Sequence, residues 1–142
     1  MSESKEDLMT LVYEADANIL SVKWSDELSV ESARFFQTIV SLFATIQEKK
    51  VANIIIDSGI PAGGVLTEEV INYFIQNIPG TPLRNIAILE SPDYLWDDNL
   101  YQVMKLLITS YQLPIAVKLV KSRAEALELF FPSLINKKPK AI

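Results

Sequence analysis

One apolar run of strand length, VANIIID at residues 51–57, decides the fold of this chain. Charged residues 48–50 precede it, and a polar turn of Ser58 and Gly59 follows it. An apolar run bounded in this way is typical of a central parallel strand that is buried on both faces of a sheet. Ligands of open α/β sheets bind beside the carboxyl ends of such strands. The sequence therefore predicts an α/β domain, and it places any ligand crevice after Asp57.

Periodicity and turn residues predict the remaining elements. Strands are expected at residues 10–15, 19–24, 85–90 and 115–120, and helices at residues 30–49, 68–78, 96–111 and 124–131. The first two strands form an antiparallel hairpin around the turn at 16–18, and β-α units follow. The expected fold is an α/β mixed sheet with the element order β-β-α-β-α-β-α-β-α. We expect a disordered lead-in at 1–9, one domain at 10–132 and a basic, solubilising tail at 133–142.

The composition narrows the range of functions. The 142 residues include no cysteine and no histidine, which removes thiolate chemistry, the commonest general base and most transition-metal sites. An enzyme is therefore not expected, nor is a cofactor or a bound metal. The net charge of −5 argues against a nucleic-acid partner. No apolar run reaches the length of about 20 residues that a membrane span needs, so a cytoplasmic protein is predicted.

The first long helix has a broad apolar surface, wider than the stripe of about 100° that one sheet face covers. Its large apolar side chains fall on two adjacent faces, so a second subunit or a neighbouring helix should cover the excess. We expect a homodimer whose interface includes Phe35, Ile39, Leu42, Phe43 and Ile46. The competing explanation is that the last helix packs beside this one through Leu127, Phe130 and Phe131.

The element order resembles that of the STAS domain, the fold of anti-sigma-factor antagonists. The resemblance spans about residues 11–131 and rests on four features: the hairpin, the strand closing in Asp57, the helix after Thr67, and the final strand-helix unit ending in Glu125-Ala126-Leu127. The chain looks closest to small bacterial STAS-like, or SpoIIAA-like, proteins. The resemblance implies a cytoplasmic regulatory module that works through protein–protein interaction with a protein partner.

The resemblance also implies where a phosphoacceptor would lie. Antagonists carry an Asp-Ser-Ser-Gly motif at the start of the helix after the central strand, and a partner kinase phosphorylates its hydroxyl. The matching position here is 64–67, where only Thr67 has a hydroxyl and the motif is absent. Asp57-Ser58-Gly59 is similar but comes too early. A plain helix N-cap is the alternative interpretation of Thr67.

Three other groups could carry chemistry. Gly63-Gly64 would let a backbone approach a phosphate but lacks the rest of a P-loop, which favours a simple turn. Tyr94 and Trp96 flank an acidic loop, where exposure would indicate an interface and burial would indicate core packing. A hard-cation site could draw on the carboxylates after two neighbouring strands, although turn and helix-start roles explain them equally well. Those carboxylates are Asp57, Glu90, Asp93, Asp97 and Asp98.

Three functions follow from these observations. The first is a non-enzymatic regulatory or protein-interaction module of STAS-like type, without an intact phosphorylation motif. The second is a carrier or sensor that binds a lipid or another apolar small molecule between helices and sheet, as the similar CRAL-TRIO domain does. The third is a metal-assisted hydrolase that uses Asp57 and the acidic loop.

Overall fold

The computed structural model of the protein describes residues 9–25, 33–57, 66–92 and 94–132. Five strands and four α-helices follow one another in the predicted order within these residues. They are β1 (Met9–Glu14), β2 (Ile19–Trp24), α1 (Ala33–Lys49), β3 (Asn53–Asp57), α2 (Glu68–Asn77), β4 (Asn85–Leu89), α3 (Tyr94–Ser110), β5 (Ala116–Val120) and α4 (Arg123–Phe130), with a short 3-10 turn, η2 (Ile78–Gly80), after α2. The α/β class and the element order are therefore confirmed.

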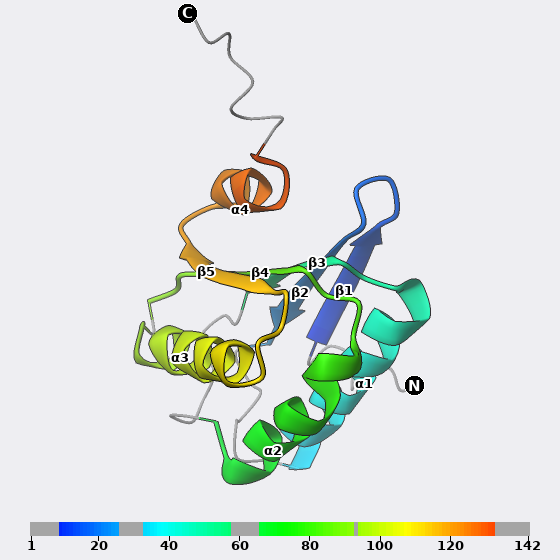
Figure 1. The fold of residues 1–142 in the computed structure, drawn as a ribbon. Helices are drawn as coiled ribbons and strands as arrows, with labels where there is room; N and C mark the ends of the chain where they lie inside the picture. Colours follow the sequence, from blue (N-terminus) through cyan, green and yellow to red (C-terminus); the bar gives the residue numbers. More distant parts are fainter. Residues whose placement is uncertain (1–8, 26–32, 58–65, 93, 133–142) are drawn as a thin grey trace, which may run out of the picture.

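The strands form a single mixed sheet in the order β1-β2-β3-β4-β5. The β1–β2 hairpin is antiparallel, and every later neighbour is parallel. Because crossovers between parallel strands are right-handed, strands added in sequential order place their connecting helices on the same face. Figure 1 shows this arrangement, with α1, α2 and α3 on one face of the sheet and α4 on the other. We call these the first face and the second face.

The central strand β3 is buried on both faces, as its sequence predicts. Ile54 and Ile56 join the large core between the sheet and α1 to α3. Ile55 points the other way and joins a smaller core beneath α4. Both clusters exist because side chains alternate across a strand, so a continuous apolar run can supply two cores at once.

The apolar surface of α1 lies inside the chain's own core, which corrects the expected interface. The side chains of Phe35, Ile39, Leu42, Phe43 and Ile46 are all buried. The excess width is covered by α2, since the ring of Phe43 lies 5.4 Å from that of Tyr73 and 5.9 Å from that of Phe74. Neither a second copy nor α4 is needed, because the sequential strand order brings α2 beside α1 and leaves α4 on the opposite face.

Within the described residues, the second face is only partly covered. Ala126 and Phe130 of α4 belong to one buried cluster with Ala87, Val120 and Ile19, so the cover extends over β3 to β5 and reaches the start of β2. On the β1–β2 half, Thr10 and Lys23 are exposed, and 53% of the surface of Val12 remains accessible. An eight-residue helix spans about 12 Å, which is less than the width of a five-stranded sheet. The uncovered half is therefore the place on the sheet where other molecules can reach it.

The hairpin turn is held to the sheet by an asparagine that adopts a left-handed conformation, with φ of 55° at Asn18. The Oδ1 atom of Asn18 accepts hydrogen bonds from the Tyr13 hydroxyl at 3.0 Å and the Ala52 amide at 3.2 Å. The backbone carbonyl of Asn18 accepts a hydrogen bond from the side-chain amide of buried Asn53 at 3.1 Å. The side-chain oxygen of Asn53 in turn accepts one from the side-chain amide of Asn85 at 2.8 Å. The sequence predicts the turn but not this network, which ties three strands together.

Candidate functional site

A hollow of about 290 Å³ lies on the uncovered half of the second face. Its walls come from β1, β2, β3, the end of β4 and the first residue of α4. The residues that line it are Thr10, Val12, Ser21, Val22, Lys23, Ile55, Asp57, Leu89 and Arg123. Alternation places most of these side chains there, since odd positions of β2 and even positions of β1 point to the second face. Val22 also borders the hollow, but its side chain joins the core of the first face. The volume is close to the lower end of small-molecule pockets, which begin at about 300 Å³.

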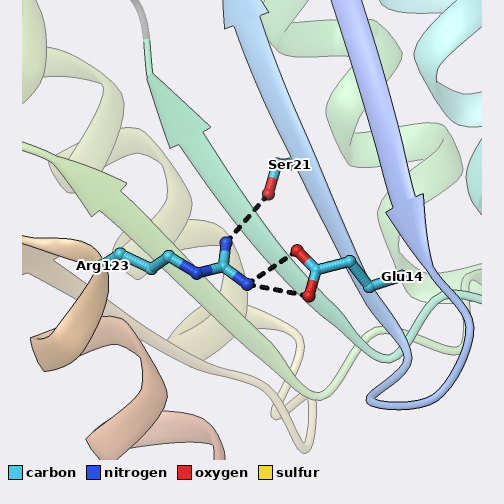
Figure 2. Close-up of polar contacts among 3 residues, drawn as sticks. All are labelled: Glu14, Ser21 and Arg123. Carbon is cyan, nitrogen blue, oxygen red and sulfur yellow. Dashed lines mark hydrogen bonds and ion pairs between the residues drawn. The ribbon is translucent and has the colours of Figure 1, made fainter.

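Arg123 closes one side of the hollow. Ser122 is the N-cap of α4, and its hydroxyl accepts a hydrogen bond from the Glu125 amide at 3.2 Å. From this position the Arg123 side chain reaches across the sheet, as Figure 2 shows. Its Nη2 atom donates to both carboxylate oxygens of Glu14, at 2.9 and 2.6 Å, and its Nη1 atom donates to Ser21 Oγ at 3.4 Å. The start of α4 is thereby tied to β1 and β2.

A second ion pair forms the opposite rim. Lys23 and Asp57 are register partners on β2 and β3, and Lys23 Nζ lies 3.5 Å from Asp57 Oδ2. Both side chains are substantially exposed, so the pair contributes little to stability. Two acidic and two basic groups therefore surround the hollow, and each acid has a basic partner. Such a balanced rim does not favour ligands of strong net charge.

The floor of the hollow is apolar, built on Val12, Ile55 and Leu89. An apolar centre within a polar, partly charged rim is the usual anatomy of a protein–protein interface. The same residues are less suited to catalysis. The Ser21 hydroxyl accepts from Arg123, and a guanidinium cannot take a proton from it. The geometry therefore suits binding rather than nucleophilic chemistry.

Thr67, the predicted phosphoacceptor, lies at the start of α2. Its backbone is extended and its hydroxyl accepts a hydrogen bond from the Val70 amide at 3.3 Å, which is the geometry of an N-cap. The side chain is half-buried. Ser58, Gly63 and Gly64, which entered the same prediction, lie outside the described residues. The N-cap role is thus present, and the phosphoacceptor role stays a prediction.

The acidic residues considered for a cation site have separate roles. Asp97 is buried in α3 and accepts hydrogen bonds from the Ser91 amide at 2.6 Å and the Ser91 hydroxyl at 3.0 and 3.2 Å. Asp57 faces Lys23 instead, and Asp98 accepts from Gln102 at 3.5 Å. Within the described ranges, which leave out Asp93, no three such groups come together as metal ligands.

Trp96 belongs to the core rather than to an exposed aromatic surface. It is fully buried, and its ring centroid lies 6.2 Å from that of Trp24 and 6.1 Å from that of Phe35. The helix α3 begins at Tyr94, two residues earlier than predicted, so Trp96 stands on a helical face that turns inward. The side chain of Tyr94 lies outside the described part of the structure.

Sequence reasoning singled out Asp57 but missed the other polar residues of the hollow. The alternation in 19–24 and the hairpin register are visible in the sequence, and together they could have placed Lys23 and Thr10 on one face. Arg123 carries no such signal, because its contact with Glu14 joins residues 109 positions apart. Its surroundings depend on where α4 crosses the sheet.

Comparisons with models of known protein families, with curated proteins and with solved structures found no match to this chain. Of the helices in the described ranges, none has both the length and the apolar character required to cross a membrane.

Proposed function

We propose that this protein is a non-enzymatic regulatory module of STAS-like type, acting in the cytoplasm through a protein partner that binds at the second-face hollow. One observation carries the proposal: no described element covers the sheet beside α4, and Val12 is 53% exposed there in a surface rimmed by two ion pairs. Support for the class comes from the hairpin followed by β-α units. Support for a non-enzymatic role comes from a sequence without histidine or cysteine.

The physical case for a protein partner lies in the chemistry of this surface. Burying Val12 and the apolar floor would gain roughly 25 cal/mol for each Å² of apolar surface removed from water. The neighbouring ion pairs provide specificity rather than affinity. Exposed pairs contribute little binding energy, but they disfavour a partner with the wrong charges. A partner that fits would present an apolar side chain to Val12 and polar groups to Lys23 and Arg123.

A capture experiment with two matched variants tests the proposal. Ser21→Phe fills the hollow from β2, whereas Ser41→Phe adds the same bulk to an exposed position of α1. Tagged wild-type protein and both variants are used to capture partners from the native organism, with quantitative mass spectrometry. We expect a protein retained by the wild type and by Ser41→Phe to be lost with Ser21→Phe. Equal capture by all three proteins contradicts the proposal.

The second candidate function is a carrier or sensor of an apolar small molecule, favoured by the same hollow. The void between the sheet and α1 to α3 measures only about 30 Å³, near the share of liquid volume of one water molecule. An acyl chain does not fit there, whereas the hollow on the second face, at about 290 Å³, is close in volume to small-molecule pockets. Native mass spectrometry after mild purification distinguishes the two functions, since a co-purifying apolar molecule favours the carrier and an empty protein favours the module. The separated acidic residues give the hydrolase hypothesis no comparable support.

A further inference from the structure

The outer edge of β1 has no partner strand among the described residues. Within the described residues, β1 pairs only with β2, in an unbroken antiparallel register from Met9↔Trp24 to Glu14↔Ile19. In such a strand, alternate backbone N–H and C=O groups point away from the neighbour. Those of β1 therefore face outward along the sheet margin. A row of this kind is a ready template for another strand.

The β1 edge lacks the usual protections of an edge strand. Its sequence, MTLVYE, contains no proline and no lysine, and its register with β2 contains no bulge. The edge at β5 differs, because that strand is shorter and carries exposed Lys118 at its centre. Charged side chains, especially lysine, are a common way to block pairing between edges. The two margins of the sheet are thus unequal, and only β1 is suited to receive a strand.

We propose that β1 pairs antiparallel with β1 of a second copy, around a two-fold axis at Val12, to give a homodimer with one continuous sheet. This inference rests on the proposed interaction function and names one of its partners. Around that axis, Val12 lies opposite Val12 of the second copy, Leu11 opposite Tyr13, and Thr10 opposite Glu14. Every pair joins side chains from the same face, because the two positions of each pair differ by an even number.

The self-complementarity of the strand argues for a second copy over an unrelated chain. A two-fold contact uses the same surface twice, so the exposed valine of each copy covers that of the other. The pairing also places no like charges directly opposite each other. Lys23 is the register partner of Thr10, so the row across the new sheet runs from Lys23 through Thr10 to Glu14 of the second copy. A lysine of one subunit thereby lies on the same face as a glutamate of the other, two strands away.

The alternative register around Leu11 is less favourable. It places Thr10 opposite Val12, so an apolar side chain meets a hydroxyl, and Glu14 falls opposite residue 8, which lies outside the described residues. The Val12 axis pairs five consecutive residues, 10–14, and leaves the hollows of the two copies next to each other on the same face. The dimer therefore joins the two hollows into one surface, in which the two Val12 side chains lie side by side.

Sedimentation velocity across a range of concentrations tests the inference. The wild type should sediment as a dimer that dissociates on dilution. Val12→Lys places two ammonium groups at the two-fold axis, where like charges repel, so association should weaken by at least about tenfold. Val40→Lys, at a similarly exposed valine on α1, should associate like the wild type. A wild type that stays monomeric, or a Val12→Lys variant that associates equally well, overturns the inference.

Hydrogen exchange of the wild type alone decides the case if Val12→Lys fails to fold. The amides of β1 should gain protection as the concentration rises, whereas those of β5 should not change. Protection gained at β5 instead contradicts the inference. The two proposals fail separately, because Ser21→Phe alters β2 and leaves the β1 edge intact. If the protein is monomeric but Ser21→Phe abolishes partner capture, only the dimer is overturned. If the protein is dimeric but Ser21→Phe captures the partner as the wild type does, only the partner site is overturned.

Discussion

Arg123 and Glu14 hold the last helix to the first strand across 109 positions of sequence, through two hydrogen bonds of 2.9 and 2.6 Å. The contact runs from the first residue of α4 across the second face to the end of β1. Arg123 leaves the helix at its first residue and crosses the sheet to β1, so its side chain forms the boundary between the covered and uncovered halves. Between the start of α4 and β1, the Arg123 side chain rather than another turn of helix crosses the sheet, and this leaves room for the hollow.

The Arg123–Glu14 pair should contribute only about 0.2–1 kcal/mol to stability, because both side chains are substantially exposed. A double-mutant cycle measures this coupling in urea. Arg123→Met keeps most of the aliphatic stem, Glu14→Gln keeps the shape of the partner, and the double variant completes the cycle. We expect the coupling to fall as salt rises. A coupling above about 2 kcal/mol at moderate salt would mean that the pair anchors α4 rather than merely orienting it.

Asn18→Ala should destabilise the fold by about 1–3 kcal/mol. The substitution places an alanine at φ of 55° and removes the acceptor of the Tyr13 hydroxyl and the Ala52 amide. Chemical denaturation followed by circular dichroism measures the loss. Asn72→Ala is the matched control, since Asn72 is exposed within α2, where alanine is the better helix former. Equal stabilities of the two variants would show that the turn network contributes nothing.

Ile39→Glu should unfold the protein rather than separate a dimer. Ile39 is 1% exposed and lies in the core beneath the sheet, so the substitution buries a charge without a partner. Val40→Glu, one position along α1 and 38% exposed, should leave the midpoint of thermal unfolding nearly unchanged. Circular dichroism and sedimentation read out folding and assembly separately. A folded, monomeric Ile39→Glu variant would restore the interface first expected on this helix.

The comparison of α1 with β3 explains which parts of the fold sequence reasoning can reach. The strand β3 was predictable because a short apolar run between polar turns has few other uses, and its central position follows from burial on both faces. The width of the apolar surface on α1 was equally visible in the sequence. The element that covers this surface was not. That depends on α2 arriving on the same face, which is a property of crossover handedness and strand order rather than of residues 33–49.

The hollow was hidden for a related reason. Single strands show which residues share a face, so Thr10 and Val12 could be grouped from the alternation alone. Whether that face is open depends on the length and the path of α4. Sequence bounds predicted the length within one residue at each end, while the path is fixed only by tertiary contacts such as Arg123 with Glu14.

Thr67 gives the last prediction, which separates a structural role from a regulatory one. As an N-cap, its hydroxyl accepts from the Val70 amide, and Thr67→Ala should cost about 1 kcal/mol of stability. Thr67→Ser keeps the hydroxyl and should retain most of that stability. Both results concern the cap alone, and unfolding in urea measures them.

The regulatory role requires a further result. If a kinase of the native organism modifies this chain, phosphate should map to Thr67, where free amides and the helix dipole stabilise an anion. Thr67→Ala should then abolish incorporation, and Ser58→Ala should leave it unchanged. Thr67→Ser should remain a substrate, because it restores the acceptor hydroxyl at the same helix start. Phosphate found at Ser58 would instead mean that the phosphorylated loop of anti-sigma-factor antagonists corresponds to the end of β3 here, and that Thr67 serves only as an N-cap.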